Sequence, residues 1–138
     1  MAVVADVQSP DTDLATLIDI RVPADPAMSR VLRLAASGVA SLAGFTVDEI
    51  EEIKIAVSEV LIALIEHGAG HPVAVSFVVD DAAFTVLGAT EVLEFDLDHP
   101  DLRLCRTVLT EVCTEHTIDV VDKQARICAV LRRPFKAA

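Results

Sequence analysis

The longest helical pattern of hydrophobic and polar residues covers residues 47–67. Apolar side chains fall on several sides of this segment, which predicts a helix buried deeply against a sheet. These apolar positions are Ile53, Ala56, Val57, Val60, Leu61, Leu64 and Ile65. Thr46 and Glu49 have the spacing of a capping box at the start of the helix, which is about 30 Å long at about 1.5 Å per residue. His67 lies in the last turn, and we expect Gly68 to end the helix in the left-handed conformation.

The remaining segments alternate between strand and helix periods. Strands are predicted at residues 15–22, in a hairpin of 73–80 and 83–87, and in a closing hairpin of 117–121 and 127–131; a short strand at 92–95 is an open alternative. Helices are predicted from Asp25-Pro26 to about Leu42 and from Pro100 to about Thr114. Their expected buried stripes are Met28, Val31, Leu32, Ala35, Val39 and Leu42 in the first, and Leu104, Cys105, Val108, Leu109 and Val112 in the second. The order indicates an α+β two-layer sandwich, with three helices on one face of a mixed, mostly antiparallel sheet.

Length and composition favour a flexible tail at residues 1–13 and a single domain at 14–138. Although 53% of the residues are apolar, no apolar run reaches the roughly 18–20 residues of a membrane span. The formal net charge of −11 argues against nucleic acid and anionic membrane as partners, because both require cations on the protein. The three cysteines form no CxxC pair, which indicates reduced thiols in a cytoplasmic protein.

The segment EIEEIKIAVSEVLIALIEHG, residues 49–68, resembles the N-box helix of the GHKL (histidine-kinase-like, Bergerat-type) ATPases. It is most similar to the bacterial anti-sigma factors that are also serine-protein kinases. In this family the helix typically carries a Ser-Glu pair, an Asn four residues later and a His four residues beyond. The sequence keeps Ser58-Glu59 and His67 but has Ala63 at the Asn position. The resemblance implies that Glu59 is the general base for phosphoryl transfer, and that Glu59, Ala63 and His67 are degenerate cofactor-binding positions.

Several departures from the family indicate a pseudo-ATPase without a cofactor. The methyl group of Ala63 cannot ligate the magnesium ion that the family's Asn holds. The resemblance places the adenine-reading Asp at Leu87 or Gly88, neither of which has a carboxylate. No glycine follows Gly88, and the segment that should cover the phosphates carries Glu91, Glu94, Asp96, Asp98 and Asp101. Since a triphosphate needs close backbone approach and N–H-rich or cationic walls, ATP and magnesium are expected only if this degenerate site still works.

Simpler interpretations remain open for the candidate residues. Glu59 is spaced by seven residues from Glu52 and Glu66, so all three can form a solvated stripe and Glu59 need not be a base, not even a vestigial one. A histidine at position 67 is favoured by the helix dipole alone. Ser58 has no base one turn away and is interpreted as structural. No metal site is expected, because the other histidines, His71, His99 and His116, lack ligand spacing.

The resemblance implies an anti-sigma-factor-like regulator that sequesters a sigma factor by protein–protein binding. A STAS-type anti-anti-sigma antagonist would be a second partner, and the protein would be a homodimer. An active ATP-dependent serine kinase that phosphorylates the antagonist is one alternative, and a dimerisation or scaffold module is another. The partner-binding face is predicted on the first helix, at Met28, Arg30, Arg33 and Leu34. The arginine fork suits carboxylates of another chain, although both arginines could instead only solvate the helix.

Overall fold

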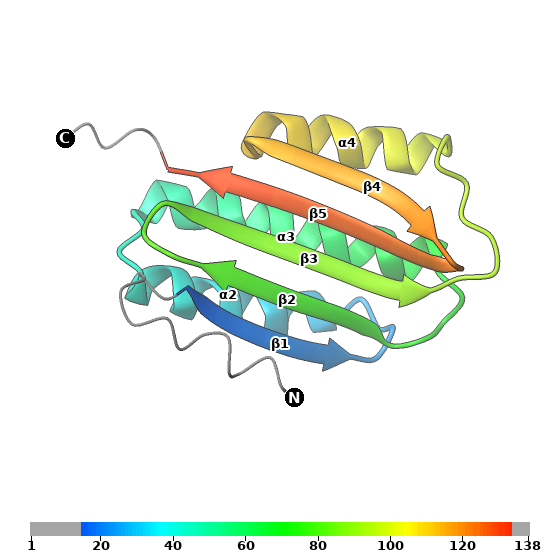
Figure 1. Ribbon diagram of the computed structural model, residues 1–138, viewed down its shortest axis with the longest axis horizontal. Coiled ribbons are helices and arrows are strands. Elements are labelled where there is room, and N and C mark those ends of the chain that lie inside the picture. The colour runs from blue at the N-terminus through cyan, green and yellow to red at the C-terminus, as the bar shows by residue number, and fades with distance from the viewer. Residues whose placement is uncertain (1–14, 134–138) are drawn as a thin grey trace.

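The computed structural model describes residues 15–133 and has two layers, a five-stranded sheet and three helices that cover one of its faces (Figure 1). The predicted tail at residues 1–13 lies outside the described residues. In chain order the elements are β1 (Thr16–Val22), α2 (Met28–Leu42), α3 (Val47–His67), β2 (Val73–Val79), β3 (Ala83–Glu91), α4 (Pro100–Val112), β4 (Glu115–Val121) and β5 (Gln124–Arg132). The α+β two-layer sandwich predicted from the sequence is confirmed. No helix among residues 15–133 is long and apolar enough to cross a membrane.

The sheet has the strand order β1-β2-β3-β5-β4, and every neighbouring pair is antiparallel. Both predicted hairpins are confirmed. In the β4–β5 hairpin, Asp122 and Lys123 have φ of 52° and 62°, the left-handed conformations that a two-residue turn requires to match the twist of its strands.

Strand β3 is longer than expected, and the alternative of a short strand at 92–95 is wrong. The last residues of β3 pair with β5, with Gly88 opposite Ile127 and Glu91 opposite Gln124. Residues 92–99 then leave the sheet and form the connection to α4. Leu93, in this connection, is 80% exposed.

Helix α3 is the central helix of the fold and packs against β2, β3 and β5. The capping box is confirmed: the Glu49 N–H donates to Thr46 Oγ1 at 3.1 Å, and the Thr46 N–H donates to Glu49 Oε1 at 2.7 Å. Seven of its side chains are buried: Ile53, Ala56, Val57, Val60, Leu61, Ala63 and Leu64. A helix that is apolar on several sides is buried on several sides, and α3 indeed contacts the sheet, α2 and α4.

Helix α2 begins at Met28, two residues later than predicted. The Asp25 carboxylate accepts the Ala27 N–H at 2.9 Å, and the Asp25 carbonyl accepts the Met28 N–H at 2.9 Å, so Asp25 caps a turn that precedes the helix. The buried stripe also differs from the prediction. It consists of Leu32, Ala36 and Ala40, whereas Val31 and Leu42 are 47% and 91% exposed.

Helix α4 begins at Pro100 as predicted and ends at Val112. Its buried residues are Leu102, Cys105 and Leu109. The expectation for Leu104 is wrong, since its side chain is 63% exposed. Cys113 follows the last helical residue and is not in the helix, and all three cysteines are free, as predicted.

Candidate functional site

Glu59, Ala63 and His67 lie one turn apart on α3 and line a single pocket of about 200 Å³. The opposite wall comes from α4, through Asp101, Leu104 and Cys105; Ile62 and Glu66 complete the lining. Carboxylates are therefore contributed by Glu59, Glu66 and Asp101, and no lysine or arginine is among the lining residues. The pocket attracts cations and repels anions.

Glu59 is half-buried, unlike the two other glutamates of its stripe. Glu52 and Glu66 are exposed, so the stripe faces water at both of these positions but not fully at Glu59. Burial, and to a smaller extent the negative charge of Glu66, raise the pKa of the Glu59 carboxyl. A raised carboxyl pKa suits a general base that works near neutral pH. Partial burial raises the pKa of any carboxyl, so the shift at Glu59 does not by itself assign it this role.

The Glu59→Gln variant is expected to be more stable than the parent at neutral pH. Because the folded-state pKa of Glu59 is raised above its usual 4.5, its contribution to stability is present below that value and is lost as the pH rises through the folded-state pKa. The stability difference between variant and parent should therefore grow from about pH 4 to about pH 7. Urea denaturation across this range measures it. Glu52→Gln, on the exposed part of the stripe, is the matched control and should change stability by less than about 0.5 kcal/mol.

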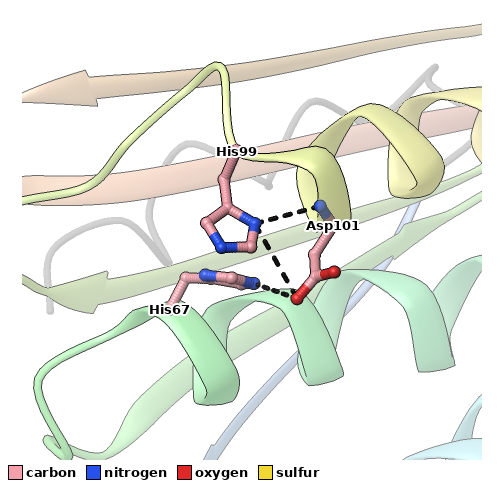
Figure 2. Close-up of side chains that lie close together, drawn as sticks. All are labelled: His67, His99 and Asp101. Atoms are coloured by element: carbon pink, nitrogen blue, oxygen red, sulfur yellow. Dashed lines mark hydrogen bonds and ion pairs between the residues drawn. The ribbon is translucent and has the colours of Figure 1, made fainter.

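His67 is in contact with two residues from the start of α4 (Figure 2). Its Nε2 atom lies 3.2 Å from Asp101 Oδ2, and its ring centroid is 4.5 Å from that of His99. His99 is the N-cap of α4, and its Nδ1 accepts the Asp101 N–H at 3.0 Å. The His67 Nε2 atom is buried, and its approach to Asp101 lacks the geometry of a hydrogen bond. His67, His99 and Asp101 therefore form a compact polar cluster at the end of the pocket.

Gly68 ends α3 in an extended conformation, with φ of −89° and ψ of −173°, so the expected left-handed stop is wrong. The position still requires glycine, because a β-carbon there would collide with the Leu64 carbonyl oxygen.

The expected adenine side of the site is filled by apolar packing. A β-carbon added at Gly88 would lie 2.7 Å from both Leu64 Cδ1 and Val60 Cγ1, so α3 sits directly on the β3 backbone at this point. Leu87 lies on the other face of the sheet and is 42% exposed. Neither position offers a carboxylate or open space next to the α3 pocket.

The structure divides the predicted partner face on α2 into two parts. Arg30 is exposed and Leu34 is 69% exposed, as an interaction surface requires. Met28 is only half-exposed and packs against the core. The Arg33 Nη1 group donates to Ser29 Oγ and to Ser58 Oγ, both at 3.1 Å. Arg33 thus links α2 to α3, and Ser58 has the structural role that was predicted for it.

Sequence reasoning missed His99 and Asp101 as neighbours of His67. The available signal was the sequence His99-Pro100-Asp101 at a helix start, which places two polar side chains on the first turn. The structure adds that this turn lies against the C-terminal end of α3 (Figure 2). His71 and His116 are not part of the cluster.

The helix-on-sheet arrangement and the pocket beside α3 agree with the histidine-kinase-like ATPase class, which the comparisons with known proteins show. The family model described as "Histidine kinase-like ATPase domain" matches residues 22–103. The chain is 40% identical over 113 residues to serine-protein kinase RsbW of Bacillus subtilis, covering 79% of this chain and 68% of the relative. It is 34% identical over 109 residues to RsbW of Bacillus pumilus, covering 75% and 64%. The chain thus spans about two thirds of the length of these relatives.

A solved structure has the same fold. The crystal structure of the RsbU and RsbW domains of a Mycobacterium tuberculosis protein superposes with a TM-score of 0.68 at 16% identity, covering 86% of this chain and 33% of that one. The chain belongs to the histidine-kinase-like ATPase family, in the group of the RsbW serine-protein kinases.

Proposed function

We propose that this protein is an anti-sigma-factor-like regulator that binds a sigma factor and does not use ATP. The observation that carries the proposal is the composition of the α3 pocket. Its volume of about 200 Å³ is below the roughly 300–1,000 Å³ of typical ligand pockets. Apart from a histidine, the charged residues that line the pocket are acidic. Where the family has the asparagine that holds magnesium, this chain has Ala63, whose side chain is a methyl group. A magnesium triphosphate would meet repulsion there and would lack its usual metal ligand.

Mg-ATP is expected to give no binding heat at sub-millimolar concentrations. Isothermal titration calorimetry of the purified protein tests this directly. A second titration with ADP, whose charge is smaller, controls for repulsion of the triphosphate alone. A saturable micromolar isotherm for either nucleotide would contradict the pseudo-ATPase part of the proposal while leaving sigma-factor binding open.

An active serine-protein kinase is the second candidate function. It is favoured by the place of Glu59, which is half-buried in the pocket with a raised pKa, as a general base for phosphoryl transfer would be. The test is transfer of labelled phosphate from ATP to a STAS-domain protein encoded near this one. Transfer that is lost in Glu59→Gln would establish kinase activity, and no transfer above a protein-free control would exclude it for that substrate.

The partners we infer are a sigma factor and a STAS-type anti-anti-sigma antagonist, in the cytoplasm, with the protein itself a homodimer. The support is membership of the RsbW group together with the exposed side chains of Arg30 and Leu34 on α2. A dimerisation or scaffold module without sigma binding remains the third candidate. Light scattering of the protein alone and with each partner separates these possibilities.

A further inference from the structure

We propose that His67, His99 and Asp101 form a binding site for a divalent transition-metal ion of the zinc type. The three residues lie where the end of α3 meets the start of α4. His67 is in the last turn of α3, and His99 and Asp101 are at the start of α4. Each offers one ligand atom, and these atoms all lie within 4.8 Å of one another. Figure 2 shows both imidazole rings next to the Asp101 carboxylate, with one nitrogen of each ring close to the same carboxylate oxygen. The proposal is independent of whether the protein binds a sigma factor or a nucleotide.

The distances suit a small ion with short bonds. Zinc lies about 2.0–2.2 Å from nitrogen and oxygen ligands, so two ligand atoms of one tetrahedral ion are about 3.3–3.6 Å apart. Asp101 Oδ2 is 3.2 Å from His67 Nε2 and 3.8 Å from His99 Nδ1. The two separations that involve Asp101 are therefore within a few tenths of an ångström of the spacing that an ion needs, and the two imidazole nitrogens lie within 4.8 Å of each other.

The chemistry of the donors selects the class of metal. Two imidazoles and one carboxylate favour zinc, copper, nickel or iron(II) over magnesium and calcium, which prefer oxygen ligands. Three protein ligands leave at least one coordination position for water. The acidic α3 pocket adjoins the cluster, because His67 and Asp101 also line that pocket.

The surroundings also favour a cation. The C-terminal end of α3 carries the negative end of its helix dipole, and Glu59 and Glu66 line the adjoining pocket. His67 Nε2 is buried, and its short approach to Asp101 is not a hydrogen bond. A metal ion between the two atoms would satisfy both, because the nitrogen and the carboxylate oxygen would each be a ligand.

One existing contact competes with the metal. His99 Nδ1 accepts the Asp101 N–H as the N-cap of α4, so ligation through Nδ1 would replace this hydrogen bond. The loss of an N-cap hydrogen bond destabilises the start of a helix. Ligation through Nε2 would require the proton to move to Nδ1, which could then no longer accept the Asp101 N–H, so the N-cap hydrogen bond is replaced by either route.

The experiment is a zinc titration of the full chain without a polyhistidine tag, followed by calorimetry and by the visible absorption of cobalt(II) in the same site. Three variants remove one ligand each: His67→Gln, Asp101→Asn and His99→Ser. Serine is a good N-cap, so His99→Ser removes the imidazole and keeps the helix start. His71→Gln is the matched control, because His71 also lies near a carboxylate, 4.0 Å from Glu91, but is 51% exposed and outside the cluster.

We expect one zinc ion per chain with a micromolar or lower Kd, a four-coordinate cobalt spectrum, and no competition from millimolar magnesium. Each ligand variant should weaken zinc binding about tenfold or more, at an unchanged melting temperature for His99→Ser, while His71→Gln should bind as the parent does. The proposal is overturned if the parent shows no saturable binding or if His99→Ser binds zinc as tightly as the parent. A cobalt spectrum with a thiolate charge-transfer band would also overturn it, since the ligands would then be cysteines.

Discussion

Replacing Leu61 with alanine is expected to lower the free energy of unfolding by about 2–5 kcal/mol. Leu61 is fully buried on α3, the helix that touches the sheet and both other helices. Truncation removes apolar burial and leaves a cavity that the surrounding helices and strands can fill only in part. Urea denaturation measures the loss through the midpoint, with an unchanged slope if the unfolding stays two-state.

Leu42→Ala is the matched control for this prediction. Leu42 is also a helical leucine, but it is 91% exposed, so the same chemical change should alter stability by less than about 0.5 kcal/mol. Equal losses in the two variants would mean that α3 is not the central packing element.

The sequence was sufficient to predict α3 because its determinants are local. The capping box joins residues three positions apart, and the apolar positions repeat on several sides of one helix. The hairpins were equally accessible, since alternation and turn residues are also local features. The family resemblance rested on this same segment, and the comparisons confirm it.

The buried faces of α2 and α4 could not be predicted from side-chain size. In α2, the buried residues include the small Ala36 and Ala40, while the larger Val31 is left half-exposed. Small residues allow two helices to approach closely, which depends on the partner helix and not on the hydrophobicity of the position. The extension of β3 to Glu91 likewise depends on its register with β5.

The candidate site combined one predictable part with one that the sequence did not reveal. Glu59, Ala63 and His67 share a helix face, so their common pocket follows from their spacing of four residues. The contact of His67 with His99 spans more than thirty positions and exists because the first turn of α4 lies on the last turn of α3. The role of Arg33 also depended on tertiary structure, since its contact with Ser58 crosses from α2 to α3.

Reversing the charge of Arg30 is expected to weaken sigma-factor binding by about 2–5 kcal/mol. Arg30 is exposed on α2, and its side chain forms no hydrogen bond or ion pair within residues 15–133. Next to it, Val31 and Leu34 are 47% and 69% exposed, so a cation is flanked by apolar surface. This combination is typical of an interface in which arginine anchors a carboxylate of the partner. In Arg30→Glu that pair becomes a repulsion, and the partner's carboxylate is left buried without a counter-charge.

The stability of Arg30→Glu should change little, because glutamate is a good helix former and the position is exposed. The measurement is calorimetric titration with the sigma factor encoded nearest to this protein, after the melting temperatures of variant and parent have been shown to match. Arg21→Glu is the control, because Arg21 is an exposed arginine on β1 and its reversal changes the net charge equally without touching α2. A loss in Arg30→Glu alone places the interface on α2, whereas equal losses in both variants indicate long-range charge only. Unchanged affinity in Arg30→Glu would remove α2 from the interface and make the acidic segment from Glu91 to Asp101 the surface to test next against a basic partner.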